Sequence, residues 1–415
     1  MQTHLADFIK DTPAGHEADA ILRSCVHCGF CLATCPTYQL LGDELDSPRG
    51  RIYLIKQALE GAPVSATTRL HLDRCLTCRS CESTCPSGVQ YGRLLDIGRD
   101  VVERRTRRGL LELWQRAALR RLLPRPMLFG TVLKLARALR PLLPRALRAA
   151  VPPAQRRGSL PATRHARRML ILDGCVQPSL APNINAAAAR LLDRLGISLA
   201  RAPQAGCCGA LSHHLNAQDA ALQQMRRNID AWWPHIESGA EAIVMTASGC
   251  GVTVKEYGHL LRLDPAYAEK AARVSALTRD LSEIVLTEKE KLSGIFAASA
   301  VQGSKLAFHA PCTLQHGQKV SGVAEEILTL AGFELTHVPD SHLCCGSAGT
   351  YSILQREISG QLLSNKIAAL ESGAPARIAT ANIGCMLQLQ RGTQRPVQHW
   401  VELLDERLIP NSGVN

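Results

Sequence analysis

The chain has 415 residues and a formal net charge of +12, and 46% of its residues are hydrophobic although only 4% are aromatic. This length suffices for two or three domains, whose cores must be mainly aliphatic. No apolar run reaches the roughly 18 residues that a membrane-spanning helix needs, and residues 1–20 include four acids, unlike a secretion signal. We therefore expect a soluble or peripheral, cytoplasmic protein whose 16 cysteines stay reduced.

The first predicted element is a dense cysteine motif that occurs twice. It reads Cys25-Val-His-Cys28-Gly-Phe-Cys31-Leu-Ala-Thr-Cys35-Pro36 and returns as Cys75-Leu-Thr-Cys78-Arg-Ser-Cys81-Glu-Ser-Thr-Cys85-Pro86. The spacing C-x2-C-x2-C-x3-C-P is typical of bacterial proteins with two [4Fe–4S] clusters, in which the fourth cysteine binds the other cluster. It predicts a first cluster bound by Cys25, Cys28, Cys31 and Cys85, and a second bound by Cys35, Cys75, Cys78 and Cys81.

Two other uses of these cysteines fit the sequence less well. Structural zinc also uses C-x2-C pairs, but usually as two pairs separated by a loop, with four sulfurs per ion. Four cysteines within eleven residues, twice, exceed that requirement. Disulfides need an oxidising compartment, and the chain shows no secretion signal.

Residues 36–74 connect the two motifs and contain three cations of interest, Arg49, Arg51 and Lys56. A cluster bound by four thiolates is negatively charged, so nearby cations stabilise its reduced form and raise its potential. The same residues are equally consistent with the solvated outer face of an ordinary helix.

Residues 99–168 carry the excess positive charge, with nineteen Lys and Arg against three acids. The charges alternate with leucines, Trp114 and Phe129, and prolines interrupt the run, which predicts short amphipathic helices. Basic amphipathic helices are candidates for docking on an anionic membrane surface or an acidic partner subunit. The alternative is a solvated linker. Nucleic acid binding is not expected, because no nucleic-acid motif accompanies the charge.

From Met169 onward the chain is an internal repeat of two modules. Each contains a short apolar strand that ends at a cysteine, a helix, a Cys-Cys-Gly segment, a second helix and another strand that ends at a cysteine; in the first module a further strand after Gly196 leads to Cys207-Cys208-Gly209. In the first module the helices are predicted at about residues 185–195 and 219–233. Both modules have 31 residues between their first cysteine and the Cys-Cys-Gly segment, which indicates a duplication. Alternation of strands and helices predicts α/β modules with parallel sheets.

The cysteines of the modules all follow predicted strands, at the sheet edge where α/β proteins build their ligand sites. Four thiols can therefore converge in each module. The candidate third centre comprises Cys175, Cys207, Cys208 and Cys250 in the first module, and Cys312, Cys344, Cys345 and Cys385 in the second. It could be a further iron–sulfur cluster, a zinc ion or free thiols, and the alternative is core packing by small apolar side chains.

These motifs resemble an iron–sulfur electron-transfer family that includes subunits of heterodisulfide reductase and anaerobic glycerol-3-phosphate dehydrogenase. The similarity is greatest to the iron–sulfur subunits of bacterial glycolate oxidase, a glycolate dehydrogenase. It is carried by residues 25–31, 37–45, 48–56, 228–234, 246–251 and 340–351. The resemblance implies that partner flavoprotein subunits with FAD oxidise glycolate to glyoxylate, and D-lactate as well. Electrons then pass through this chain, which is not catalytic alone, toward quinone at the inner face of the cytoplasmic membrane.

One departure from that family concerns the modules. Heterodisulfide-reductase-type modules end in C-x2-C, whereas the corresponding second positions here are Thr253 and Gln388. The unusual noncubane cluster of that family is therefore not expected. Alternative functions are the iron–sulfur subunit of a glycerol-3-phosphate or D-lactate dehydrogenase, and a heterodisulfide-reductase-like thiol catalyst.

The sequence predicts four divisions of the chain. Residues 1–98 form a mostly helical, ferredoxin-like domain for two [4Fe–4S] clusters, and residues 99–168 form a basic helical linker. Residues 169–300 and 301–415 form the first and second Cys-Cys-Gly modules.

Overall fold

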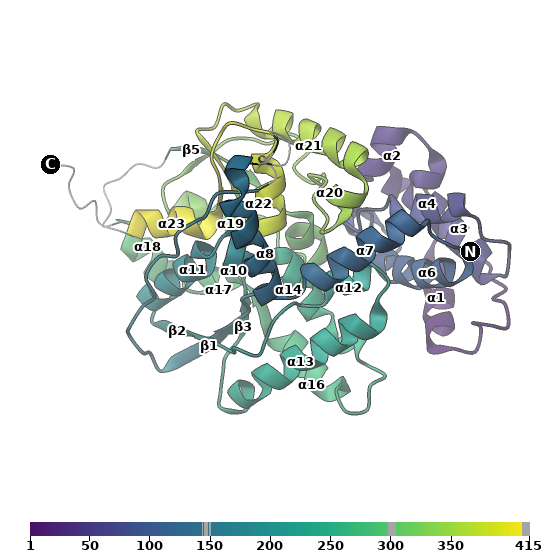
Figure 1. Cartoon of the computed structure of the whole chain (residues 1–415), viewed down its shortest axis with the longest axis horizontal. Coiled ribbons are helices and arrows are strands. Elements are labelled where there is room, and N and C mark those ends of the chain that lie inside the picture. Colours follow the sequence, from purple (N-terminus) through teal and green to yellow (C-terminus); the bar gives the residue numbers. More distant parts are fainter. Residues whose placement is uncertain (143, 145–147, 149–150, 298–303, 409–415) are drawn as a thin grey trace.

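The computed structural model describes residues 1–142, 144, 148, 151–297 and 304–408 (Figure 1). A helical N-terminal region lies at one end of the molecule, and two α/β modules form the rest. The predicted boundary between residues 300 and 301 lies outside the described residues. The boundary predicted between residues 98 and 99 falls inside helix α6 (Tyr91–Arg105).

The N-terminal region is held together by four helices. They are α1 (Pro13–Ser24), α3 (Pro48–Leu59), α4 (Ala66–Asp73) and α6. Three of them begin at a Thr or Ser whose hydroxyl accepts a backbone N–H of the first turn, which satisfies a donor that the helix itself cannot. Their apolar faces meet in one core that contains Leu22, Ile55, Leu94 and Leu95. The predicted mostly helical character of this region is confirmed.

Short helices carry the cysteine loops between these four. They are η1 (Phe30–Leu32), α2 (Pro36–Leu41), η2 (Glu44–Asp46) and α5 (Ser80–Thr84). Pro36 occupies the first turn of α2, where a missing N–H costs nothing.

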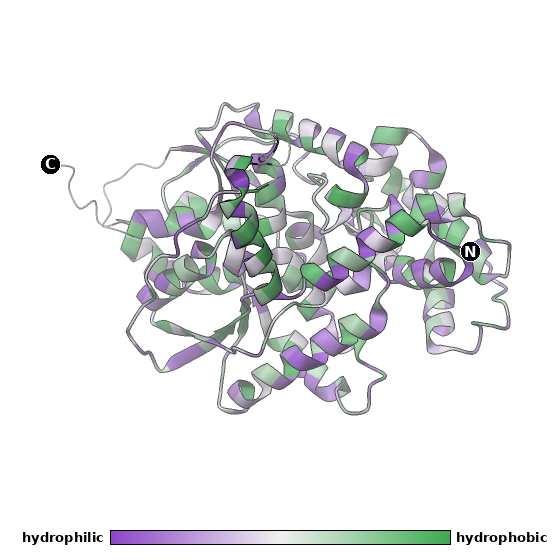
Figure 2. Cartoon of the chain, in the orientation of Figure 1, coloured by the Kyte–Doolittle hydropathy of each residue, from purple (hydrophilic) through white to green (hydrophobic). Residues whose placement is uncertain are grey.

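Two amphipathic helices follow, α7 (Leu110–Leu122) and α8 (Pro126–Ala138), and then the single turn η3 (Arg140–Leu142). In Figure 1, α7 extends toward the N-terminal region, whereas α8 lies over the modules and packs against α10 (Gln177–Leu180). In Figure 2 much of α8 is hydrophobic, although Leu133 is its only residue described as buried. Short helices in the basic segment are thus present as the sequence predicts.

Each module contains a parallel sheet with four strands. The strand order is β2-β1-β3-β4 in the first module and β6-β5-β7-β8 in the second, which is the same topology. The strands are β1 (Arg167–Ile171), β2 (Ile197–Arg201), β3 (Ile243–Met245), β4 (Thr278–Asp280), β5 (Lys305–His309), β6 (Glu334–Leu335), β7 (Arg377–Thr380) and β8 (Val397–His399). The predicted duplicated α/β architecture is confirmed, and β4 and β8 add strands beyond the last cysteine of each module.

Helices cover these sheets. In the first module they are α10, α11 (Asn183–Arg194), α12 (Ala210–His214), α13 (Gln218–Glu237), α14 (Ser248–Lys255), α15 (Tyr257–Leu260), α16 (Ala268–Leu277), α17 (Leu281–Thr287) and α18 (Lys289–Ala297). In the second they are η4 (Thr313–Gly317), α19 (Val323–Leu330), α20 (Tyr351–Leu354), α21 (Arg356–Glu371), α22 (Ile383–Gln390) and α23 (Trp400–Leu408).

The two modules share one hydrophobic core. It joins Ile171 and Leu191 of the first module to Leu306 and Trp400 of the second. Helices α11 and α23 pack together across this joint, where Arg190 pairs with Asp405 at 2.5 Å. The first module has a further core of its own around Trp232 on the other face of its sheet. The modules therefore form one body, in which the second depends on the first for part of its apolar burial.

Candidate metal centres

The first cysteine motif wraps a cavity in the N-terminal region. Its cysteine lining includes Cys25, Cys28, Cys31 and Cys85, and apolar side chains such as Ile52 and Val89 complete it. The loop turns because the residues on both sides of Cys28 have left-handed backbone, with φ of 56° at His27 and 86° at Gly29. The second motif repeats this at Thr77 and Arg79, with φ of 54° and 60°. The two loops thus share the same left-handed turns at equivalent positions, which glycine adopts without strain and His27, Thr77 and Arg79 do not.

The second cavity is lined by Cys35, Cys75, Cys78 and Cys81. Each cavity thus contains three cysteines of one motif and the fourth of the other, and Cys81 lines the first cavity as well. These are the crossed sets that the motif spacing predicts, and their role as ligands remains a prediction. The donor set fits [4Fe–4S] clusters, because each cavity offers at least four thiols together with an arginine that can offset the negative charge of a cluster. Burial raises the pKa of Cys31 to about 11.

Arg51 is the cation most closely built into these sites. Its side chain is 1% exposed and lines the second cavity. It donates to the Thr37 hydroxyl at 3.0 Å, to the His71 carbonyl at 2.7 Å and to the fully buried Asp46 carboxylate at 3.1 Å. Although burial opposes its charge, Cys75 and Tyr91 help to hold the Arg51 pKa above its usual range.

The other two cations that the sequence analysis named have different surroundings from Arg51. Arg49 lines the first cavity and pairs with Glu44 at 2.5 Å. Lys56 pairs with Glu60 at 2.6 Å and does not line either cavity. The sequence analysis missed Arg99, which is buried and donates to the carbonyl of Cys75 and the hydroxyl of Thr77. No local pattern distinguishes this arginine from its many basic neighbours.

The four thiols of the first module form an interacting row in the order Cys175, Cys207, Cys208, Cys250. Hydrogen bonds from Cys175 and Cys208 hold the pKa of Cys207 well below its usual range. Side chains of α13 and α15 hold the backbone of the adjacent residues Cys207 and Cys208. Asn228 donates to the Cys207 carbonyl at 2.9 Å, and Tyr257 donates to the Cys208 carbonyl at 2.8 Å. The structure therefore brings the four predicted cysteines together.

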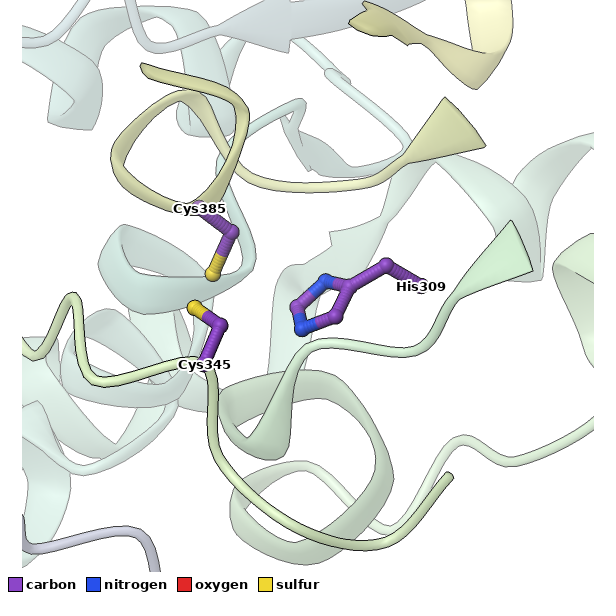
Figure 3. A group of neighbouring side chains, drawn as sticks. All are labelled: His309, Cys345 and Cys385. Atoms are coloured by element: carbon purple, nitrogen blue, oxygen red, sulfur yellow. The ribbon is translucent and has the colours of Figure 1, made fainter. Parts of the chain in front are cut away.

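The second module repeats the row with Cys312, Cys344, Cys345 and Cys385. The sulfurs of Cys312 and Cys344 are 3.8 Å apart. His309 also joins this group: its ring faces Cys345 and Cys385, and one ligand atom from each of the three lies within 4.8 Å of the others (Figure 3). The sequence analysis missed His309, although its position three residues before Cys312, at the end of a predicted strand, was visible.

The backbone conformation of both Cys-Cys-Gly segments requires glycine at their third position. Gly209 and Gly346 have φ of 93° and 81°, in the left-handed region. A side chain at Gly346 would approach the Ser359 carbonyl oxygen to 2.7 Å, so that only glycine permits the close packing on α21.

The second cavity lies directly against the second module. Leu76 and Cys78 of the cysteine loop pack in one cluster with Cys312, Cys344 and Tyr351. The Tyr351 hydroxyl donates to the Arg74 carbonyl at 2.9 Å. The first module meets the N-terminal region through ion pairs instead, including Arg79 with Glu256.

Part of the basic charge of residues 99–168 is structural. Arg108 is buried and pairs with Asp73, Glu103 and Glu112. Exposed apolar side chains gather on α7 and α8 instead: Leu110, Leu111, Trp114, Met127 and Leu135. Within the described residues, no helix is both long and apolar enough to cross a membrane.

Comparison with known proteins finds domain families that match both halves of the chain. Residues 21–89 match the family of 4Fe-4S dicluster domains, and residues 169–255 and 306–390 each match a cysteine-rich domain. The chain is 56% identical to the glycolate oxidase iron-sulfur subunit of Escherichia coli over 98% of this chain and 99% of that protein. It is 32% identical to a probable glycolate oxidase iron-sulfur subunit of Bacillus subtilis, over 90% of this chain and 89% of that one. Lactate utilization protein A of Bacillus licheniformis is 28% identical over 56% of this chain and 97% of its own length.

Proposed function

Because the chain belongs to the family of glycolate oxidase iron-sulfur subunits, we propose that it is the electron-transfer subunit of a glycolate dehydrogenase complex. In this proposal, flavoprotein partners with FAD oxidise glycolate to glyoxylate, and D-lactate as a related substrate. This chain then carries the electrons toward quinone. The pocket for the hydroxy acid lies on the partners, and the chain alone is not catalytic.

The observation that carries the proposal is the pair of adjoining cysteine-lined cavities. Both are lined by Pro48, Cys81 and Tyr91, so that two bound centres would be neighbours. Bound [4Fe–4S] clusters supply one-electron oxidation and reduction. The residues of the chain hold and tune the centres: Ile52 and Val89 limit water at the first, and Arg51 and Arg99 place positive charge beside the second.

The proposed ligand sets can be tested by spectroscopy. Cys28→Ser is expected to alter only the first cluster, whereas Cys35→Ser is expected to alter the cluster held by Cys75, Cys78 and Cys81. Electron paramagnetic resonance of the reduced protein distinguishes the two signals. If Cys35→Ser changed only the signal lost in Cys28→Ser, the crossed ligand sets would be wrong.

A thiol catalyst that reduces disulfides is less consistent with the modules. The positions that would hold an additional cysteine carry Thr253, which donates to the Gly249 carbonyl, and Gln388, which donates to the Ser359 hydroxyl. Cys344, Cys345 and Cys385 are all buried, which limits access by a disulfide substrate. We propose that the module cysteines stay reduced and hold a further metal centre.

The exposed apolar face of α7 and α8 supports peripheral attachment at the inner face of the cytoplasmic membrane. Its leucines, Trp114 and Met127 lie among arginines such as Arg120 and Arg121, a combination that favours an anionic lipid surface. Charge reversal at the buried Arg108 would disturb folding, so a docking test should change Trp114 and Met127. Loss of membrane fractionation with unchanged iron content is the expected result.

The decisive experiment is reconstitution under anaerobic conditions. The purified chain is expected to be inert alone, and to restore dye reduction when added to flavoprotein partners supplied with glycolate. D-Lactate and glycerol 3-phosphate serve as competing donors. A higher rate with glycerol 3-phosphate, or disulfide reduction by the chain alone, would overturn the proposed function.

A further inference from the structure

His309 carries an unused metal-binding atom into the second module. It ends β5, and its side chain is almost completely buried, at 2% exposure. Its Nδ1 lies 3.0 Å from the Thr380 hydroxyl, whereas Nε2 has no hydrogen-bond partner among the described residues. A buried polar atom without a partner costs free energy, so that its retention suggests a ligand.

The His309 ring faces two thiols (Figure 3). One ligand atom each from His309, Cys345 and Cys385 lies within 4.8 Å of the other two, and all three residues are buried (Figure 3). In the described part of the chain, no such close trio includes a cysteine of the N-terminal cavities or of the first module. Ligands of one tetrahedral ion lie close together, because zinc–sulfur and zinc–nitrogen bonds are only about 2.0–2.3 Å long. Ligands of a cubane bind different irons and lie farther apart.

The second module also contains a buried cation. Lys366 is 3% exposed, and its ammonium donates to the Asp340 carbonyl at 2.7 Å. Burial lowers the Lys366 pKa, an effect that Cys344 and Cys345 partly oppose, and among the described residues its ammonium forms no ion pair with a carboxylate. A buried ammonium requires nearby negative charge.

We propose that His309, Cys345 and Cys385 bind a single zinc ion in the second module. Thr380 accepts the Nδ1 proton of His309, which leaves the Nε2 lone pair free for the metal. The first module lacks this site, because Leu172 stands three residues before Cys175, where His309 stands before Cys312. The ion is structural and carries no electrons. This assignment does not depend on the hydroxy acid that the complex oxidises.

The test uses the full chain purified anaerobically, with zinc and iron counted separately. About one zinc per chain is expected in addition to the iron of the clusters. His309→Gln is expected to weaken zinc binding by more than about 100-fold, since loss of an outer hydrogen-bond partner alone costs up to about 100-fold. His316→Gln is the matched control, because His316 lies in the same module but contacts Ser83 and the His342 carbonyl. It should retain its zinc, and both variants should keep the iron of the unchanged protein.

Cobalt substitution provides a readout that does not require a variant to fold. Co²⁺ in the unchanged chain should give the visible bands of a tetrahedral site and thiolate-to-metal charge transfer, and one equivalent of zinc should abolish both. Absence of tetrahedral cobalt bands would overturn the proposal. So would zinc retention in His309→Gln, or additional iron that Cys345→Ser removes, since the latter would assign a cluster to this module.

Discussion

The two cysteine-rich modules have the same strand order and four cysteines each, yet they differ in what surrounds those cysteines. The first has an all-thiol row, and ion pairs connect it to the N-terminal region, among them Arg262 with Glu17 at 2.6 Å. The second adds His309 to its thiols and packs its first two cysteines on the loop of the second cavity. The two copies share the sheet topology and the cysteine positions, and they differ in single residues beside those cysteines.

The largest expected effect concerns the cores of the two modules. Trp400 and Trp232 are both fully buried, the first in the shared core and the second in the separate core of the first module. Replacement of either by alanine should lower the free energy of unfolding by about 3–5 kcal/mol. Trp400→Ala should loosen both β1 and β5, as measured by hydrogen exchange. Loss of protection in the second module alone would show that the modules are independent.

The joint between the modules should also be sensitive to acid. His399 of β8 donates from Nε2 to the Thr246 carbonyl of the first module at 2.8 Å, and its Nδ1 accepts the Val401 N–H. Burial lowers the His399 pKa to about 4, below the value of about 6.5 in an unfolded chain. The unfolded state therefore takes up a proton first, and stability present above pH 6.5 is lost as pH falls toward 4.

The contribution of His399 to this loss should be about 1.4 kcal/mol per pH unit, and about 3 kcal/mol in total. Urea denaturation at several pH values gives the free energy of unfolding. Subtracting the profile of His399→Gln removes the contributions of the other histidines. Parallel profiles for the two proteins would contradict the assignment.

The apolar contact between the second module and the N-terminal region should contribute less to the free energy of unfolding. Leu76→Ala should cost about 2–3 kcal/mol, because Leu76 is buried against Cys312, Cys344 and Tyr351. The loss should not depend on salt, since no charge is removed. Denaturation at low and high ionic strength measures it, and a strong salt dependence would mean that this contact is not mainly hydrophobic.

The ionic contact between the first module and the N-terminal region should contribute least to the free energy of unfolding. Glu256→Gln is expected to cost about 1 kcal/mol, because the side chains of Arg79 and Glu256 are 15% and 26% exposed. This loss should shrink as ionic strength rises, in contrast to that of Leu76→Ala. Equal losses at all salt concentrations would remove the distinction between the two contacts.

The sequence by itself determined the features that depend on spacing along the chain. The cysteine motifs predicted the two loops, and the apolar runs before Cys175 and Cys312 predicted β1 and β5. The helix predicted at 185–195 is α11, displaced by one or two residues. The helix predicted at 219–233 continues through Pro234 to Glu237 as α13. Such features arise from hydrogen bonds and burial within a short segment, which the local pattern of residues records.

Only the tertiary structure decided which distant residues meet. Arg51 reaches the second cavity while Lys56, five residues later, pairs with Glu60, because opposite faces of α3 point to the core and to solvent. Tyr351 meets Arg74, and His309 meets Cys385, across segments that no periodicity relates. Their positions follow from how helices and sheets pack over long separations, where many side chains contribute and none leaves a local signature.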